Sequence, residues 1–287
     1  MSGYARPGSL DEALDILAGP RGWRVLAGGT DLYPGLGDAL RRADLLDITG
    51  LSELRGITPG EHGYRIGALT TWSEIAAADL PPFFDALRQS AREVGSVQIQ
   101  NVATVAGNVV NASPAADGTV ALMALGAEVE IAGPDGARRV PVGDFVTGVR
   151  AVALGPGELV TALTVPDHGA RARSHFLKLG ARRYLVISIA MAAVMLRPDA
   201  QGRIADAGVA VGACAPVARR LTGLEARLRG AAPGECAARL RDGDAEGLAP
   251  IDDVRAPARY RAEAVPVLLR RCLEACDGAH DGARDAG

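Results

Sequence analysis

Two short stretches of small and polar residues have the types and spacing that suit an anionic ligand. The first is Leu26-Ala-Gly-Gly-Thr-Asp31, which follows a short apolar run. Its adjacent glycines remove side chains where a ligand would approach the backbone. The second stretch, 100–117, contains the small-residue turn Ala106-Gly107-Asn108 and then Ser113-Pro114. Serine suits an N-cap and proline the first helical position, so we predict that a helix begins there and favours an anion.

Neither stretch alone establishes a binding site. Most helices that begin with Ser-Pro bind nothing, and an ordinary Gly-Gly turn is the favoured interpretation of 26–31 by itself. That stretch is neither G-x-G-x-x-G nor a P-loop, and short glycine motifs have many false positives. The case for a phosphate ligand becomes stronger only when the two stretches are considered together.

The composition is that of a globular protein without nucleic-acid or membrane character. The chain has 287 residues, a length typical of about two domains, with 48% apolar and 23% charged residues. The net charge is −3 and there is no basic run, which argues against nucleic-acid binding. The apolar stretches are too short for a membrane span, and the N-terminus lacks the apolar core of a signal peptide. We therefore expect a soluble cytoplasmic protein.

The four cysteines, Cys214, Cys236, Cys272 and Cys276, form no C-x-x-C pair. Their spacing is not a zinc or iron–sulfur signature. We interpret them as small buried hydrophobic residues in a reducing compartment. No metal site and no iron–sulfur cluster is therefore expected on this chain.

The pattern of apolar residues predicts an α+β protein in three parts, 1–57, 58–170 and 171–287. The first is a βαβ-type unit with a capping box at Ser9 and Glu12. Its helix is expected at 10–17 and its strands at 23–27 and 45–48. The second part is an α+β layer with a mixed or antiparallel sheet. Its helices are expected at 73–78, 82–94 and 115–125, and its strands at 64–69, 129–131, 138–142 and 158–165.

A third part follows a polar boundary at 167–173. Its strands are expected at 174–180, 187–196 and 204–212, with a hairpin turn at 198–202. Helices are expected at 217–228, 235–241 and 256–275, and the polar residues 277–287 are expected to form a frayed tail. This pattern predicts a three-stranded antiparallel sheet with helices.

An ordered set of motifs resembles the FAD-binding medium subunit of the molybdenum hydroxylases, a family that includes xanthine dehydrogenase and carbon monoxide dehydrogenase. The motifs are Tyr4-x-x-Pro7, Leu26-Ala-Gly-Gly-Thr-Asp-Leu32, Thr104-Val-Ala-Gly-Asn108, Ala112-Ser-Pro-Ala-Ala-Asp117, Asp144-Phe145, Glu158-Leu159 and Lys178-Leu-Gly-Ala-Arg-Arg183. Each motif is weak alone, but their order and spacing across nearly the whole chain are specific. The resemblance implies a two-subdomain FAD-binding module of the p-cresol methylhydroxylase/vanillyl-alcohol oxidase type, followed by a small C-terminal α+β domain.

The resemblance also implies which residues bind FAD. The pyrophosphate is expected between two glycine-rich turns, whose N–H groups form an anion-binding concavity without Lys or Arg. Thr30 and Thr104 are expected to donate hydroxyl hydrogen bonds, Asp117 to accept from the adenosine side, Lys178 to lie beside the flavin ring, and Val94 to pack on the cofactor. The complete implied set is Val25, Leu26, Ala27, Gly28, Gly29, Thr30, Asp31, Leu32, Val94, Thr104, Val105, Ala106, Gly107, Asn108, Asp117 and Lys178. No catalytic acid–base residue is expected on this chain.

Several positions depart from the family pattern. Gln100 stands where the family often has arginine, and Ala106 stands where it often has glycine. A positive φ at Ala106 would cost about 1 kcal/mol. The segment after Lys178 has no carboxylate, which argues against NAD⁺ as electron acceptor. The absence of a cysteine cluster between 126 and 160 argues against the benzoyl-CoA reductase branch.

The leading hypothesis is an electron-transfer flavoprotein subunit. It would take electrons from the [2Fe–2S] clusters of a small subunit, in a dimer of heterotrimers whose large subunit carries the molybdenum cofactor. A stand-alone FAD-dependent oxidase is a second possibility, and it would need a general base near the flavin. A third is a non-catalytic assembly subunit that has lost FAD. The organic substrate is not readable from this chain.

Overall fold

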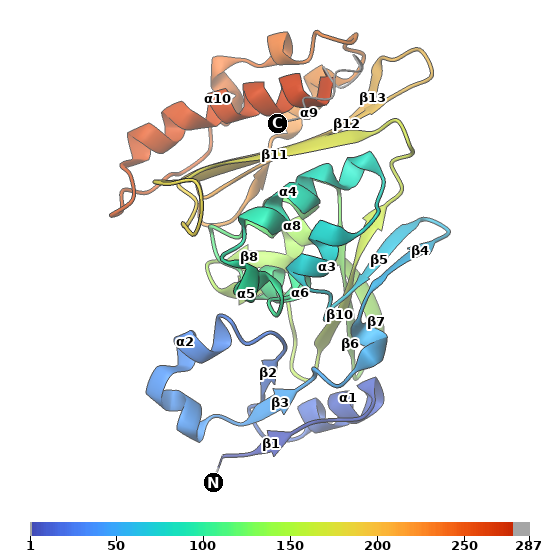
Figure 1. The fold of residues 1–287 in the computed structure, drawn as a ribbon, viewed down its shortest axis with the longest axis vertical. Coiled ribbons are helices and arrows are strands. Elements are labelled where there is room, and N and C mark those ends of the chain that lie inside the picture. The colour runs from blue at the N-terminus through green and yellow to red at the C-terminus, as the bar shows by residue number, and fades with distance from the viewer. Residues whose placement is uncertain (1, 278–287) are drawn as a thin grey trace.

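The computed structural model describes residues 2–277. These residues form three units stacked along the long axis of the molecule, each with its own sheet (Figure 1). Every unit contains both helices and strands, and the sheets of the second and third units are antiparallel, so the predicted α+β class is confirmed.

The first unit is built on a parallel sheet with the strand order β1-β3-β2. Its elements are β1 (Tyr4–Ala5), α1 (Leu10–Ala18), β2 (Arg24–Leu26), α2 (Leu32–Leu36), the 3₁₀ helix η1 (Gly37–Arg42), β3 (Leu45–Asp47) and η2 (Ser52–Leu54). The Ser9 hydroxyl accepts from the Glu12 N–H, as predicted. The Glu12 carboxylate accepts from the N–H of Gly8 instead of Ser9, so the capping box is only half formed.

The second unit is an antiparallel five-stranded sheet covered by short helices. Its strand order is β4-β5-β10-β6-β7. The strands are β4 (Ile57–Gly60), β5 (Gly63–Gly67), β6 (Glu128–Gly133), β7 (Gly136–Pro141) and β10 (Leu159–Pro166), with a small hairpin of β8 (Val146–Gly148) and β9 (Ala151–Val152). The helices are α3 (Trp72–Ala77), η3 (Pro82–Phe84), α4 (Asp85–Glu93), α5 (Val97–Gln100), α6 (Val105–Val110), α7 (Asp117–Ala124) and α8 (Val142–Phe145).

The helix predicted to begin at Ser113-Pro114 begins later, at Asp117, so this prediction is wrong. The Ser113 hydroxyl accepts from the Ala115 N–H, and the Ser113 carbonyl accepts from the Ala116 N–H. Serine thereby closes a local turn in place of a helix cap. The N-cap of α7 is Ala116, which has no side-chain cap bond.

The third unit has four antiparallel strands instead of the predicted three, in the order β11-β12-β13-β14. The strands are β11 (Arg173–Leu179), β12 (Ala190–Pro198), β13 (Ile204–Gly212) and β14 (Arg219–Arg220), and the helices are α9 (Thr222–Leu228), η4 (Ala237–Arg239), η5 (Asp242–Ala245) and α10 (Ala258–Asp277). The predicted helix 217–228 therefore starts as a strand. The buried Glu225 carboxylate accepts from the Val209 N–H and from Arg220 Nε, and this fixes β14 against β13.

Two further boundaries differ from the prediction. The helix predicted at 235–241 is reduced to the 3₁₀ turn η4. Asp277, predicted to begin a frayed tail, is buried in the last turn of α10, and its carboxylate accepts from the Cys236 N–H at 3.0 Å. The rest of the predicted tail, 278–287, lies outside the described residues.

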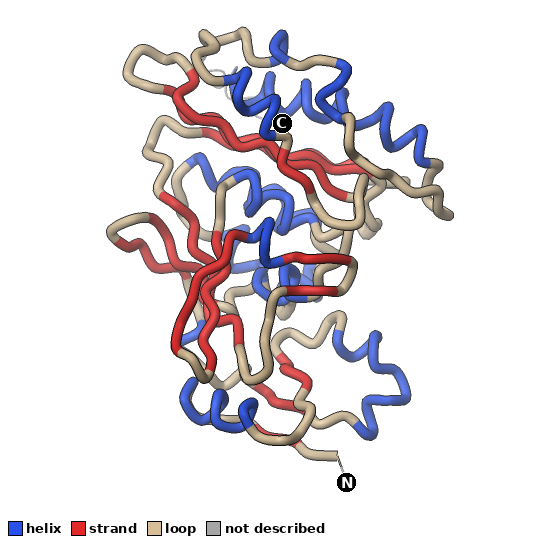
Figure 2. The backbone as a smooth tube through the Cα atoms, turned by 180° about the vertical axis from the view of Figure 1, so that it is seen from behind, coloured by secondary structure: helices blue, strands red, loops and turns tan. Residues whose placement is uncertain are grey.

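The sheet of the third unit is covered on both faces. Alternate residues of β12 point to opposite sides, as the period of a strand requires. Met191, Ala193 and Met195 join the core shared with the second unit, and the residues between them join the core under α10. Figure 2 shows α10 along the outer face of this sheet and the helices of the second unit against its inner face.

Glycines in β13 let helix α7 approach this sheet very closely. A Cβ at Gly208 would lie 1.9 Å from the Ala124 carbonyl oxygen, and one at Gly212 would lie 2.5 Å from the Val120 side chain. Every residue of α7 is buried. Its apolar residues are therefore core, as predicted, and not part of a cofactor box.

Three further observations concern the described residues. All four cysteines are buried and free. No group of three or more potential metal-binding side chains occurs within 2–277. None of the helices described is both long and apolar enough to cross a membrane. The cytoplasmic location stays a prediction.

A bidentate ion pair links the edge strand β7 to Glu158, the residue directly before β10. Arg138 of β7 donates from Nε and Nη2 to the Glu158 carboxylate, both at 2.7 Å, and the Gly155 N–H also donates to it. The hydrogen bond from Arg138 is the main cause that lowers the pKa of Glu158 from about 4.5 to about 2. A carboxylate with a depressed pKa stabilises the fold above its unfolded-state pKa, and this stabilisation is lost as the pH falls through the folded-state pKa.

We expect Glu158→Gln to lower the free energy of unfolding by about 1 kcal/mol at neutral pH. The difference from the unsubstituted chain should shrink as the pH falls from about 4.5 to about 2. Urea unfolding across this pH range measures it. Glu61→Gln, at a carboxylate with an exposed fraction of 87%, is the control and should change little. An equal deficit at both ends of the range would contradict the assignment.

Candidate functional site

The first glycine turn leaves a row of backbone donors unused. It follows β2, an edge strand, and Gly29 has φ +70°, which favours glycine. Within the part of the chain that the structure describes, the N–H groups from Gly28 through Leu32 donate to no protein acceptor. Asp31 is the N-cap of α2 but makes no side-chain cap bond. The turn therefore presents several N–H groups that a ligand can use.

The predicted second turn, 104–108, is instead the start of the short helix α6. Thr104 is its N-cap, and its hydroxyl accepts from the Gly107 N–H at 3.0 Å. Ala106 has a right-handed backbone and is absent from the residues with positive φ, so the departure from glycine there carries no strain. Gly107 is exposed, and a Cβ on it would lie 2.7 Å from the Thr104 hydroxyl.

The two motifs lie directly against each other. A Cβ at Gly28 would be 2.1 Å from the Val102 carbonyl oxygen and 2.8 Å from Ala103 Cα. Real Cβ atoms do not approach backbone so closely, so this contact requires glycine. The pairing of the two stretches, which the sequence analysis proposed, is therefore present in the fold.

Gln100, in place of the family arginine, has a local role. Its side-chain amide donates to the carbonyls of Arg92 and Val94, at 3.2 and 3.0 Å. Val94 is the C-cap of α4 and packs on the central core. Gln100 therefore holds the chain at Val94, one of the predicted contact residues.

Asp117 and Lys178 form a buried ion pair. Lys178 Nζ lies 2.8 Å from Asp117 Oδ2, and the side chains are 7% and 5% exposed. The Ser188 hydroxyl donates to Asp117 Oδ1 at 2.5 Å, and Lys178 also donates to the Glu93 carbonyl at 3.3 Å. Burial raises the pKa of the Asp117 carboxyl, while Lys178 and Ser188 act in the opposite direction. Because the two side chains touch, they cannot lie at opposite ends of a bound FAD, as the sequence analysis placed them.

Arg150 contacts residues of both stretches and was not among the predicted site residues. Its guanidinium donates to the Asn111 carbonyl at 3.2 Å and lies 3.9 Å from the Asp31 carboxylate. Its N–H donates to the Ala112 carbonyl at 2.9 Å, and both residues have positive φ, 57° and 47°. Strained non-glycine residues often mark functional sites. The turn residues Gly148-Val-Arg150 carried no visible sequence signal of these contacts.

The residues of the two stretches offer polar groups that suit a polar ligand. In addition to the unused N–H groups, the structure has two buried side-chain oxygens, of Asn108 and Thr119, that have no hydrogen-bond partner within the described chain. Buried polar groups without partners are rare, and a bound ligand or water is one way to satisfy them. These atoms come from the second motif and from α7, on the side of the site that Asp117 occupies.

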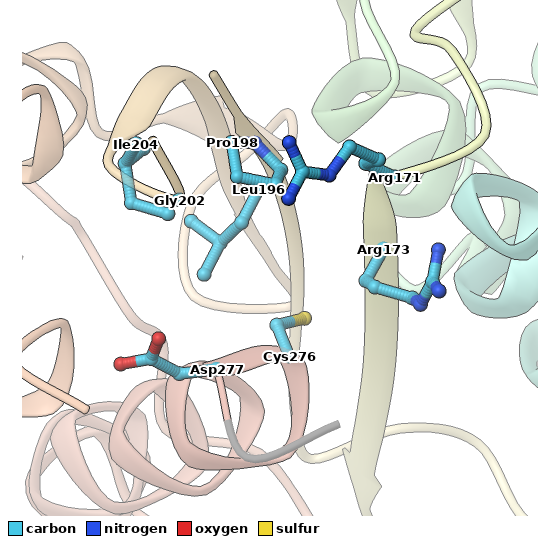
Figure 3. A pocket seen from close by; sticks show the side chains of 8 residues that line it. All are labelled: Arg171, Arg173, Leu196, Pro198, Gly202, Ile204, Cys276 and Asp277. Carbon is cyan, nitrogen blue, oxygen red and sulfur yellow. The ribbon is translucent and has the colours of Figure 1, made fainter. Parts of the chain in front are cut away.

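Two hollows elsewhere on the molecule do not include these motifs. The hollow in Figure 3 lies in the third unit, between Arg171, Arg173 and Cys276, and its volume of ≈ 10 Å³ suits about one water. Another, of ≈ 310 Å³, lies between α1 and the β6–β7 turn and is lined by Asp11 and Asp15. Neither suits a nucleotide at the glycine turns.

Comparison with known proteins agrees with this geometry. Residues 1–168 match the family described as FAD binding domain in molybdopterin dehydrogenase, and residues 175–276 match the CO dehydrogenase flavoprotein C-terminal domain. The chain belongs to this family of FAD-binding dehydrogenase subunits. The resemblance seen in the sequence motifs is therefore confirmed, and FAD is the cofactor of the family.

Relatives of this flavoprotein family match over nearly the full chain. The xanthine dehydrogenase FAD-binding subunit of Escherichia coli O157:H7 is 30% identical over 97% of each chain. The carbon monoxide dehydrogenase medium chain of Afipia carboxidovorans is 31% identical over 94% of this chain and 95% of its own. The solved structure of reconstituted CO dehydrogenase from Oligotropha carboxidovorans superposes with a TM-score of 0.88 at 30% identity, over 97% of this chain and 98% of that one. These flavoproteins are dehydrogenase components, so this chain is an oxidoreductase component too.

We expect Gly28→Ala to destabilise the protein by about 1–3 kcal/mol, because the new methyl group meets backbone that cannot move aside. Denaturant unfolding of the full chain measures the loss. Gly35→Ala is the matched control, since its Cβ would meet nothing within 4 Å. The control should change stability by no more than about 0.5–1 kcal/mol. Equal stability of the two variants would show that the contact between the motifs is not tight.

Proposed function

We propose that this chain is the FAD-carrying electron-transfer subunit of a molybdenum-containing hydroxylase or dehydrogenase. Its partners would be a large subunit with the molybdenum cofactor and a small subunit with [2Fe–2S] clusters, in a dimer of heterotrimers. When bound, FAD supplies the redox chemistry, taking electrons from the clusters and passing them to NAD⁺, O₂ or another acceptor. The relatives named as medium chain and FAD-binding subunit support this assignment.

The observation that carries the proposal is the row of unused N–H groups at Gly28 through Leu32, held against the second motif by the contact of Gly28 with Val102. Neutral backbone donors in a concave turn bind a diphosphate without a basic cluster. The Thr104 hydroxyl accepts from Gly107 but keeps its own proton to donate. No hydrogen bond from the Thr30 hydroxyl to a described group is present, so it too is available.

We place both Asp117 and Lys178 at the flavin-ring end of the cofactor. Their ion pair supports a single location for the two side chains. This location replaces the adenosine-side role expected for Asp117. Lys178 Nζ has three protons, and it donates to Asp117 and to the Glu93 carbonyl. One N–H of the Lys178 ammonium therefore remains free to donate to the cofactor.

The stand-alone oxidase has less support. It needs a general base beside the flavin, and histidine is the commonest choice. Of the histidines within 2–277, His168 bonds to the Leu125 carbonyl, His175 to Gln89, and His62 lies beside Glu61. None of these contacts involves a motif residue. The segment between Lys178 and Ser188 contains no carboxylate, which favours an acceptor other than NAD⁺.

We expect Gly107→Val to weaken FAD binding while the chain still folds. The new side chain meets the Thr104 hydroxyl, which must shift slightly, and it fills the exposed space over the second motif. A steric cost of about 1–3 kcal/mol in the complex corresponds to roughly fivefold to 150-fold weaker FAD binding. Titration of the full chain with FAD, followed by flavin fluorescence, measures it.

Gly223→Val is the matched control for this experiment. Gly223 is also an exposed glycine in the first turn of a helix, and its nearest contact would be the Arg227 guanidinium at 3.8 Å. It should bind FAD normally. If the unsubstituted chain and both variants retain no FAD, the chain is an assembly subunit and the proposal is wrong.

Arg150 supplies a charge prediction for the same site. Removing the guanidinium with Arg150→Ala leaves the Asp31 carboxylate beside the diphosphate without its cation. We expect FAD affinity to fall by about fivefold, equivalent to about 1 kcal/mol for an exposed pair. Adding Asp31→Asn should restore most of the loss in the same titration. A loss that the second substitution does not repair would mean that Arg150 acts directly on the cofactor.

A further inference from the structure

The Ser188 hydroxyl occupies a position that neither the motifs nor the family comparison assign. Ser188 lies at the end of the segment between β11 and β12 and is 2% exposed. Its hydroxyl donates to Asp117 Oδ1 at 2.5 Å, while Asp117 Oδ2 pairs with Lys178 at 2.8 Å. Each carboxylate oxygen therefore has a separate partner, and both partners belong to the third unit. Rotation of the carboxylate would break both contacts.

Buried hydrogen bonds fix the backbone beside Ser188. The next residue, Ile189, donates its N–H to the Leu179 carbonyl at 2.7 Å and accepts from Arg261 Nη1 at 2.5 Å. Arg261 is itself 2% exposed and pairs with Asp253 at 2.7 Å. The Ser188 hydroxyl is therefore attached to backbone that hydrogen bonds hold in place. The residues just before it, Tyr184, Leu185 and Ile187, are more than half exposed.

The position of the Asp117 carboxylate controls how much of the Lys178 charge is neutralised. Inside a protein the attraction between two charges is strong because water does not screen it. An ionised carboxylate that is held by a serine donor cancels most of the field of the ammonium. A carboxylate that turns away or takes up a proton leaves this field in place.

We propose that Ser188 is a positioning residue for the flavin end of the site. Its hydroxyl holds Asp117 against Lys178 and thereby sets the positive charge presented to the bound cofactor. This inference rests on the proposed function, in which FAD binds beside Lys178. More positive charge there favours electrons on the flavin and raises its midpoint potential.

The test is a redox titration of the FAD-loaded full chain, followed by the flavin absorbance. Ser188→Ala should keep its flavin and shift the midpoint potential to more positive values. Ser188→Cys retains a weaker donor, so it should shift the potential less, and it also serves if the alanine variant does not fold. Ser188→Thr keeps the hydroxyl and should restore the original potential. Asp117→Asn removes the negative charge and should shift it furthest in the same direction.

Ser174→Ala is the matched control. Ser174 is another buried serine, in β11, and its hydroxyl donates to the Phe83 carbonyl and accepts from the Ala86 N–H, away from the ion pair. This variant should lose stability without a change in potential. An unchanged potential in Ser188→Ala, or an equal shift in Ser174→Ala, would overturn the positioning role. A wild-type chain that binds no FAD would overturn the proposed function instead, so the two failures are distinct.

Discussion

The buried ion pair between Asp117 and Lys178 determines how the FAD-binding part and the C-terminal part fit together. Each side chain would be a buried, uncompensated charge without the other, and such a charge is strongly destabilising. The pair forms only because α7 can approach the third sheet, where Gly208 and Gly212 leave room for its backbone and side chains. Charge and close packing therefore specify the same relative placement of the two parts.

Neutral and charged groups have different roles in the proposed site. The donors offered to a diphosphate are backbone N–H groups and threonine hydroxyls, whose positions are fixed by the approach of Gly28 to Val102. The charged groups are already paired, Lys178 with Asp117 and Arg150 with Asp31. Such an arrangement binds an anionic cofactor while keeping little net charge at the site, which suits a protein that tunes a redox group.

The sequence predicted what depends on local patterns, and it missed what depends on distant contacts. Periodicity placed the long strands β12 and β13 and the helix α10 nearly correctly. It did not reveal β14, because Arg219 and Arg220 become a strand only through Glu225 and the neighbouring β13. Ser113-Pro114 had the residues of a helix start but closes a turn. The contact between Asp117 and Lys178, 61 residues apart, was not readable, although each residue was named by family resemblance.

The sandwiched position of the third sheet has a consequence for how the chain folds. Its inner face completes the core of the FAD-binding part, and its Lys178 neutralises a carboxylate buried there. We therefore expect the two regions that match separate families to depend on each other for stable folding. The chain from 1 to 168 alone would expose the apolar side of α4 and α7 and leave Asp117 without its partners. During synthesis, the FAD-binding part would therefore keep part of its apolar surface exposed until the third sheet has been made, and exposed apolar surface is what chaperones bind.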